Sequence, residues 1–179
     1  MILVLMGVSG VGKTTIGKLL SARVGWSFED ADDYHSEGSR RKMAAGIPLT
    51  DADRAPWLAT LHARMVEYFQ QDRSVIFACS ALKQRYRERL SAGFAENEFR
   101  FVYLYAPASV IRERIQLRGH AFMNPNLLDS QMETIEKPSE AWPVSVAGSP
   151  EESVDDILVR LKETGQLTTV PRNDANCQQ

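Results

Sequence analysis

The sequence predicts an α/β fold in which a parallel sheet carries helices on both faces. Apolar runs without polar alternation, such as "SVIFACS" at 74–80, are typical of strands that are covered on both sides. These runs alternate along the chain with segments of helical periodicity, and this alternation favours a parallel sheet. At 179 residues the chain is long enough for one domain with a substantial core. We expect this domain to cover residues 1–167 and the polar tail at 168–179 to be disordered.

The strands are expected from the apolar runs and from their boundaries. The first run extends from Ile2 to Met6 and stops at a glycine-rich stretch. The run "FRFVYLYA" at 99–106 is rich in β-branched and aromatic residues, which are typical of strands. Besides these two and the run at 74–80, we expect a short strand that ends near Asp30 and a last short one at 144–148.

The helices are expected from apolar residues at helical spacing. After the glycine-rich stretch, Ile16, Leu19 and Leu20 follow this spacing, and Gly25 is a typical C-terminal stop. The same spacing predicts further helices at 55–71, 82–93, 108–119 and 149–165. For the last of these, Ser149 is a candidate N-cap.

Composition and charge narrow the class of protein. The formal net charge of −2 and the pI near 5.9 argue against a general nucleic-acid or membrane-surface binder, which would show a basic excess. The apolar N-terminus lacks a basic region and is too short for a signal sequence or a membrane span. Cys79 and Cys177 are far apart and one lies in the polar tail, so we expect no disulfide framework. The resulting expectation is a cytoplasmic enzyme with no nucleic-acid or membrane partner.

The glycine-rich stretch "GVSGVGKT", Gly7 to Thr14, fits the phosphate-binding pattern G-x-x-x-x-G-K-[ST]. Glycines let the backbone turn so that its N–H groups surround phosphate oxygens, while Lys13 meets the outer phosphates and the Thr14 hydroxyl reaches Mg²⁺. The expected strand before and helix after supply the required context. We therefore predict ATP and Mg²⁺ as cofactors, with nucleotide contacts from Gly7, Ser9, Gly10, Val11, Gly12, Lys13, Thr14 and Thr15.

The charged stretch "EDADDYHSEGSRRKM" follows the second expected strand. Ligands of open α/β sheets bind beyond the carboxyl ends of the strands, which is the edge that also carries the glycine-rich loop. Asp30 and Asp32 would point the same way if the chain stayed extended there. One carboxylate could help to hold Mg²⁺ while the other accepts a proton from a substrate hydroxyl. The alternative is a solvated, aspartate-rich turn, and the position beside the loop favours a site.

Four motifs carry a resemblance to a known family. "GVSGVGKTTIG", "DADDYH…KM..G.PL.D.DR.PWL", "ACSALK..YR" and "HAF….LL.SQ.ETIEKP" are similar to motifs of the small P-loop gluconate kinases, relatives of shikimate kinase. The resemblance runs from about Ile2 to Pro138. It implies a three-layer P-loop kinase fold with a parallel sheet of about five strands and a mobile lid at approximately 114–137. It also implies transfer of the ATP γ-phosphoryl group to the 6-hydroxyl of D-gluconate, and a homodimer.

The resemblance also implies roles for individual residues. Asp30 matches the aspartate that the family places near the metal, and Thr14 is the other implied metal contact. Asp53 belongs to the segment that surrounds the substrate. The implied catalytic residues are Lys13, Asp32, Arg114 and Arg118. The implied substrate contacts are Asp32, His35, Lys42, Arg54, Ser80, Lys83 and Arg87, whereas His120 and Gln131 match the lid pattern without an assigned role.

The sequence leaves three questions open: the effect of two unusual serines, the anchor of the substrate carboxylate, and the function itself. Ser36 and Ser39 stand where the family usually carries proline and asparagine, which bears on substrate affinity more than on reaction type. The substrate carboxylate needs a cationic anchor, for which Arg54 and the Lys83/Arg87 group are both candidates. The rival functions are a related kinase for shikimate, a nucleotide or another sugar acid, and a sensor that binds ATP and a metabolite but turns over poorly.

Overall fold

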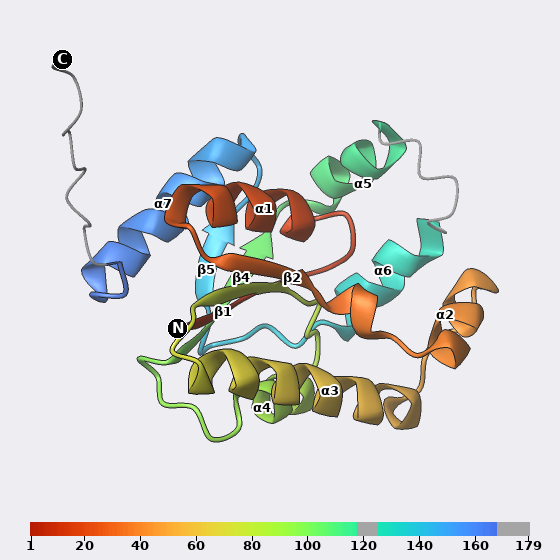
Figure 1. Cartoon of the computed structure of the whole chain (residues 1–179). Coiled ribbons are helices and arrows are strands. Elements are labelled where there is room, and N and C mark those ends of the chain that lie inside the picture. Colours follow the sequence, from red (N-terminus) through yellow and green to blue (C-terminus); the bar gives the residue numbers. More distant parts are fainter. Residues whose placement is uncertain (118–124, 168–179) are drawn as a thin grey trace, which may run out of the picture.

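The central sheet has five parallel strands in the order β2-β3-β1-β4-β5 (Figure 1). The computed structural model describes residues 1–117 and 125–167. The strands are β1 (Ile2–Met6), β2 (Ser27–Asp30), β3 (Val75–Ala78), β4 (Phe99–Tyr105) and β5 (Trp142–Ser145). The predicted parallel α/β sheet is therefore confirmed. The predicted last strand begins two residues earlier than expected, and only its Val144 is fully buried.

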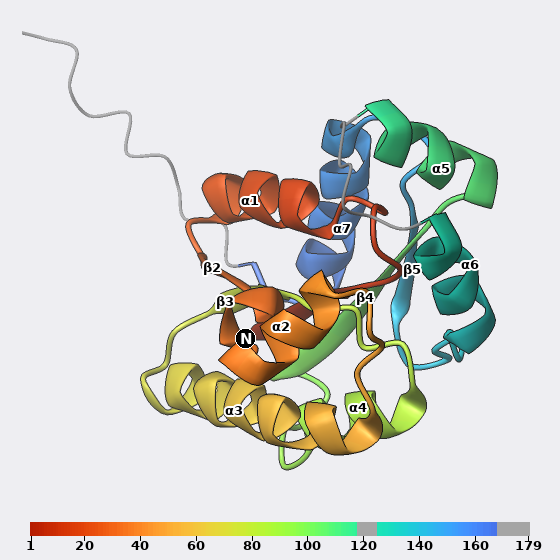
Figure 2. The ribbon, with the colours of Figure 1, turned by 90° about the vertical axis from the view of Figure 1, so that its right-hand side faces the viewer.

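Helices cover both faces of this sheet. In Figure 1, α1 (Lys13–Val24) and α7 (Pro150–Glu163) lie on one face, and α3 (Asp51–Gln70) and α4 (Gln84–Ser91) lie on the other. The remaining elements border the carboxyl ends of the strands, which face the viewer in Figure 2. These are the short 3₁₀ helix η1 (Ala31–Tyr34), α2 (Glu37–Ala44), α5 (Ala108–Leu117) and α6 (Pro125–Thr134).

The sheet separates two apolar cores. All five residues of β1 are buried, as expected for the central strand of a parallel sheet. Because side chains alternate along a strand, Ile2, Val4 and Met6 pack with α3 and α4, and Leu3 and Leu5 pack with α1 and α7. This arrangement fixes β1 firmly, and the glycine-rich loop leaves from its carboxyl end.

The helix boundaries differ from the predicted ones for local reasons. α3 begins at Asp51, four residues before the predicted start, because Thr50 and Asp53 form a capping box. α4 begins at Gln84, because the chain first makes a turn in which Ala81 has a φ of 43°. α2 and α6 were not predicted as helices. α2 is rich in charged residues and buries only Ser39, so it has no apolar stripe for periodicity to detect.

The described part of the chain offers no candidate for a membrane-spanning helix, since none of its helices is both long and apolar enough.

Candidate active site

The glycine-rich loop connects β1 to α1 and forms the centre of the candidate site. All of the predicted nucleotide contacts lie in this loop or in the first turn of α1: Gly7, Ser9, Gly10, Val11, Gly12, Lys13, Thr14 and Thr15. At Gly7 the φ is 140° and an added Cβ would lie 2.5 Å from the Leu104 carbonyl oxygen. Only glycine therefore fits where the loop passes β4.

Lys13 points its ammonium into the curve of this loop. Its Nζ donates to the carbonyl oxygens of Gly7 at 3.0 Å and Val8 at 3.1 Å. Burial lowers the pKa of Lys13, although the negative charges of Asp32 and Asp30 oppose that effect. A partly desolvated ammonium that faces two carboxylates is suited to meet a phosphate group.

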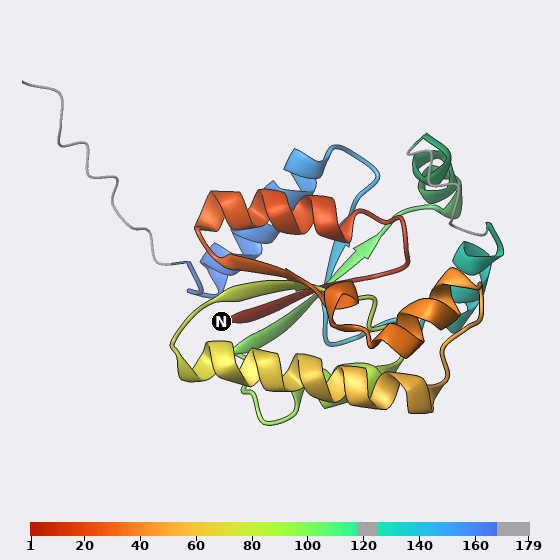
Figure 3. The same cartoon turned by 45° about the vertical axis from the view of Figure 1, so that its right-hand side comes forward.

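Asp30 ends β2 and reaches across to the start of α1. The Thr14 hydroxyl donates to its Oδ2 at 2.8 Å, and its Oδ1 accepts from the Asp32 backbone N–H at 3.2 Å. Figure 3 shows the glycine-rich loop and η1 at the same end of the sheet. The prediction that Asp30 and Asp32 share one direction in an extended chain is wrong. The chain turns into η1 directly after Asp30, and Asp30 caps that turn.

Asp32 nevertheless lies in the site. It is the second residue of η1, and its charge acts on both Lys13 and His35. Desolvation raises the pKa of Asp32, and repulsion from Asp30 adds to the increase, but the side chain is 87% exposed and solvent screens both effects. A carboxylate with a raised pKa accepts a proton more readily than one with the ordinary value.

His35 and Trp57 stack behind Asp32. Their ring centroids are 4.5 Å apart with an angle of 11° between the planes. His35 Nε2 lies 3.9 Å from Asp32 Oδ1, and its buried Nδ1 has no hydrogen-bond partner among the described residues. Burial lowers the pKa of His35 despite the nearby Asp32 charge. Trp57 also donates from Nε1 to the Ala31 carbonyl at 2.8 Å, so this core residue holds η1 in place.

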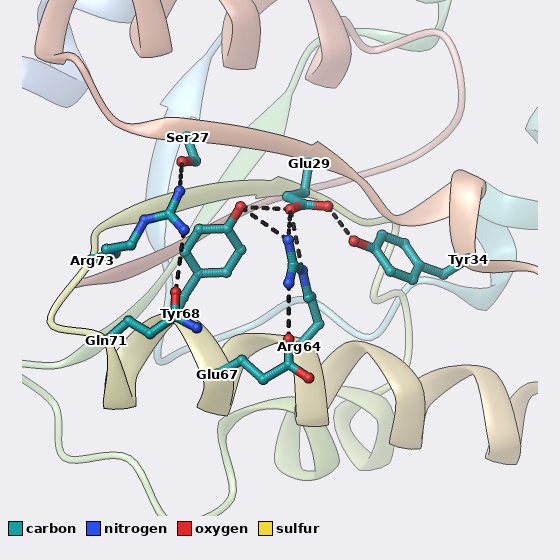
Figure 4. A network of polar contacts seen from close by, with 8 residues as sticks. All are labelled: Ser27, Glu29, Tyr34, Arg64, Glu67, Tyr68, Gln71 and Arg73. Atoms are coloured by element: carbon teal, nitrogen blue, oxygen red, sulfur yellow. Dashed lines mark hydrogen bonds and ion pairs between the residues drawn. The ribbon is translucent and has the colours of Figure 1, made fainter.

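A polar network anchors the other end of η1 (Figure 4). Glu29 Oε1 accepts from Arg64 Nη2 at 3.0 Å and from the Tyr68 hydroxyl at 2.6 Å, while its Oε2 accepts from the Tyr34 hydroxyl. Burial alone would raise the pKa of Glu29, but these hydrogen bonds outweigh it and lower the pKa. This network could not be predicted from local patterns, because its members come from β2, η1 and α3 and meet only after folding.

Ser36 and Ser39 begin α2. Ser36 Oγ accepts from the Ser39 backbone N–H at 3.1 Å, which is the usual N-cap hydrogen bond. Its hydroxyl also donates to Ser39 Oγ at 3.1 Å. Arg40, in the next turn, donates from Nε to the His35 carbonyl at 3.0 Å and from Nη2 to the Asp33 carbonyl. The serines therefore give α2 its start, and Arg40 ties α2 back to the aspartate turn.

Lys42 and Asp53 meet between α2 and α3. Lys42 Nζ lies 2.7 Å from Asp53 Oδ1. The hydrogen bond from Lys42, with those from Thr50, lowers the pKa of Asp53 to about 2. These two predicted members of the substrate segment are thus brought together as an ion pair. The pair joins α2 to the capping box of α3.

Arg54 and Lys83 lie around the ring of Tyr86. The Arg54 guanidinium is 5.9 Å from the ring centroid and donates to the Leu49 carbonyl, and Lys83 Nζ is 5.7 Å from the same ring. Lys83 also lies 3.6 Å from Asp51 Oδ1. Both cations thus belong to one cluster at the start of α3 and α4.

Ser80 and Arg87 occupy different sides of the turn after β3. The Ser80 carbonyl accepts from the Gly7 N–H at 3.2 Å, which joins this turn to the glycine-rich loop. Arg87 is only 3% exposed and donates to Glu140 Oε1 at 2.6 Å and to the carbonyls of Ala81 and Leu82 at 3.3 Å. Its guanidinium is turned into the protein, so the predicted substrate contact of Arg87 stays a prediction, and the contacts that the structure shows are internal ones. Arg87 holds the turn in place through its hydrogen bonds to the two carbonyls.

The predicted lid is described only at its two ends. Arg114 Nη2 donates to the Gly148 carbonyl at 3.0 Å and so joins α5 to the loop after β5. Arg118 and His120 lie outside the described residues. Gln131, on α6, contacts Ser9 of the glycine-rich loop through both polar atoms of its side chain. Sequence reasoning assigned no role to Gln131, because nothing in its surroundings along the chain points to the loop.

Comparison with known proteins decides the family. Residues 2–138 match the family model described as an AAA domain. The chain is 39% identical to a probable gluconokinase from Dictyostelium discoideum, over 90% of this chain and 86% of that protein. It is 42% identical to a gluconokinase from Gluconobacter oxydans, over 89% of this chain and 88% of that protein. The chain belongs to the gluconokinase family.

Solved structures agree with this membership. A gluconokinase from Sinorhizobium meliloti superposes with a TM-score of 0.80 at 37% identity, covering 92% of this chain and 93% of the other. A shikimate kinase from Aquifex aeolicus superposes with a TM-score of 0.56 at 19% identity, which shows a shared fold. The resemblance stated from the motifs and the predicted P-loop kinase fold are both confirmed. In this gluconokinase-family chain, the glycine-rich loop is the nucleotide-binding P-loop.

Proposed function

We propose that this protein transfers the γ-phosphoryl group of ATP to the 6-hydroxyl of D-gluconate, giving 6-phospho-D-gluconate and ADP. One observation carries the proposal. Asp32, a carboxylate with a raised pKa, lies at the same strand edge as the P-loop and its Lys13, in a chain of the gluconokinase family. Phosphoryl transfer to an alcohol needs both groups: a cation for the phosphates and a proton acceptor for the hydroxyl.

Asp32 has the surroundings of a general base. When the substrate hydroxyl attacks the γ-phosphorus, its proton passes to the Asp32 carboxylate as the new P–O bond forms and the bond to the ADP oxygen breaks. The raised pKa favours that proton transfer. His35, stacked on Trp57, limits how far the carboxylate can move on one side. Lys13 compensates negative charge on the transferring group, and Arg114 and Arg118 are proposed to assist it.

Mg²⁺ is proposed to bind at Thr14 and Asp30. Both offer hard oxygen atoms of the kind that Mg²⁺ prefers. The two side chains lie side by side, since the Thr14 hydroxyl donates to Asp30 Oδ2 at 2.8 Å, so they could hold the ion together, directly or through water. The described residues contain no cluster of three or more histidine, cysteine or acidic side chains that could hold a metal alone. The two protein ligands therefore suit a metal that is shared with phosphate, where it would offset the charge of the phosphates.

Arg54 is proposed to anchor the gluconate carboxylate. Lys42 and Lys83 already have carboxylate partners, Asp53 and Asp51 respectively. Among the described residues Arg54 forms no ion pair, so its positive charge is the least compensated of the three. A guanidinium can also bind a carboxylate through two parallel hydrogen bonds. Ser80 and His35 are proposed to contact the hydroxyl groups.

A homodimer, supported by family resemblance, and a cytoplasmic location are part of the same proposal. Size-exclusion chromatography with light scattering tests the dimer, because the monomer mass is 20.1 kDa.

A coupled assay of ADP release tests the reaction. We expect turnover with D-gluconate to exceed clearly the turnover with shikimate, nucleoside monophosphates and other aldonates at equal concentration. NMR of the product should show phosphate on the 6-oxygen. If ADP release with gluconate equalled the ATP-only background, the proposal would be wrong. Turnover with another acceptor alone would instead identify a related small-molecule kinase.

A further inference from the structure

Gln131 makes a two-point contact with Ser9 of the P-loop. Its Oε1 lies 2.6 Å from the Ser9 backbone nitrogen, and its Nε2 lies 3.1 Å from Ser9 Oγ. The two residues are 122 positions apart in the chain. One side-chain amide thus holds both the backbone and the side chain of a single loop residue.

The chemistry of the two atoms fixes the direction of both hydrogen bonds. A backbone N–H can only donate, so the atom of Gln131 that faces it must be the carbonyl oxygen. The other atom is then the amide nitrogen, which can only donate, and Ser9 Oγ must accept from it. This arrangement leaves the hydroxyl proton of Ser9 to be donated to a third group.

Ser9 lies at the end of the P-loop that receives the outer phosphates. The Lys13 ammonium contacts the carbonyls of Gly7 and Val8, the two residues directly before Ser9. The lysine of a P-loop meets the β- and γ-phosphates. The Ser9 hydroxyl is therefore close to the place where those phosphate oxygens are expected.

The helix that carries Gln131 is fixed to the rest of the domain. Leu128, one turn earlier on α6, is 1% exposed in the core. After the helix, the Glu136 N–H donates to the Leu82 carbonyl at 2.9 Å. These contacts hold α6, which lies in the segment expected to form the lid, on both sides of Gln131 and so present the amide to Ser9. Such support is what a side chain needs in order to orient another group.

We propose that Gln131 is a positioning residue that orients the Ser9 hydroxyl as a hydrogen-bond donor to the outer phosphates of ATP. This inference rests on the proposed ATP-dependent kinase function and adds a residue to its nucleotide site. Gln131 acts through Ser9: its own oxygen takes the Ser9 N–H and its own nitrogen occupies a lone pair of the hydroxyl. The hydroxyl proton is thereby directed towards phosphate.

A double-mutant cycle tests the coupling. Gln131→Met removes both hydrogen bonds at similar volume, Ser9→Ala removes the hydroxyl and keeps the backbone N–H, and a third variant combines them. ATP affinity is measured by calorimetry, and KM is measured for ATP and for gluconate. We expect each single change to weaken ATP binding about tenfold, the pair to be little worse than either, and the gluconate KM to change less than about twofold.

Gln131→Glu tests whether Gln131 orients the Ser9 hydroxyl or only attaches α6 to the P-loop. This variant keeps the oxygen that accepts the Ser9 N–H but replaces the amide nitrogen by a second acceptor. The Ser9 hydroxyl would then donate to the new carboxylate and not to phosphate, so ATP binding should fall at least as far as in Ser9→Ala. The matched controls are Gln70→Met and Gln70→Glu, at the exposed end of α3. They should bind ATP like the unmodified protein, and all variants should melt within a few degrees of it.

The outcomes are distinguishable from failure of the proposed function. Additive losses in the cycle, unchanged or tighter ATP binding by Gln131→Met, or a Gln131→Glu variant with normal ATP affinity would each overturn the inference. If the unmodified protein bound ATP but did not phosphorylate gluconate, the proposed substrate would be wrong. The binding cycle would still decide the role of Gln131, because it does not depend on the acceptor.

Discussion

The Thr14 hydroxyl donates to Asp30 Oδ2 at 2.8 Å and so joins the first turn of α1 to the end of β2. Both oxygens are of the hard type that Mg²⁺ prefers. We expect Asp30→Asn to raise the Mg²⁺ concentration needed for half-maximal turnover about tenfold or more, because a neutral amide is a weaker ligand for a hard cation. Kinetics at several Mg²⁺ concentrations measure this shift. Asp33→Asn, an exposed neighbour, is the control, and an unchanged Mg²⁺ requirement in Asp30→Asn would exclude Asp30 as a ligand.

Asp32→Asn should nearly abolish turnover and leave ATP affinity within about twofold of normal, because the variant loses the proton acceptor but keeps the P-loop. The pH profile follows from the direction of the Asp32 pKa. The active form is the ionised one, so kcat should fall as the pH falls through a pKa above the ordinary aspartate value of about 3.9. Steady-state kinetics between about pH 4 and pH 8 measure both effects. Loss of ATP binding in Asp32→Asn would mean that this carboxylate serves the nucleotide instead.

Arg54→Met should raise the KM for gluconate by about tenfold or more and change the KM for ATP little, because a charge-assisted bond to the substrate carboxylate is lost. Arg89→Met, an exposed change on α4, is the control. The assay is steady-state kinetics with each substrate varied in turn. An equal effect from Lys83→Met and none from Arg54→Met would transfer the anchoring role to Lys83.

The main effect of Arg87→Met should be a loss of folding stability. The guanidinium is 3% exposed and bonds to Glu140 and to two carbonyls of the turn after β3. Its removal should cost about 1–3 kcal/mol of unfolding free energy, since the buried carbonyls lose their donor. Chemical denaturation measures this loss. A variant of normal stability with a strongly raised gluconate KM would instead support Arg87 as a substrate contact.

The Lys42–Asp53 pair predicts a change of stability with pH. The folded-state pKa of Asp53 is about 2, below the ordinary value of about 3.9, and the hydrogen bond from Lys42 is the largest cause. A depressed carboxyl pKa stabilises the fold above the unfolded-state pKa, and this stability is lost as the pH falls from about 4 to about 2. Lys42→Met should therefore be less stable than the unmodified protein at pH 6, and the difference should shrink towards pH 2. A difference that stayed constant with pH would exclude this linkage.

The sequence alone determined the parts of this protein that depend on local physics. The P-loop follows from glycine spacing, the strands from uninterrupted apolar runs, and α7 from Ser149 as its cap. These features depend on neighbours along the chain, so they could be predicted without a structure. The order of strands and helices then places the P-loop and the aspartate turn at one edge of the sheet.

Only the tertiary structure decided which side chains meet across that edge. The turn after Asp30 depends on α3, from which Trp57 bonds to Ala31 and Arg64 bonds to Glu29. This is why an extended chain was the wrong expectation. Arg87 is buried because Glu140, 53 residues later, lies opposite it. Gln131 reaches Ser9 only after α6 packs on the core. Such contacts join distant segments through packing, and no local pattern of residues records them.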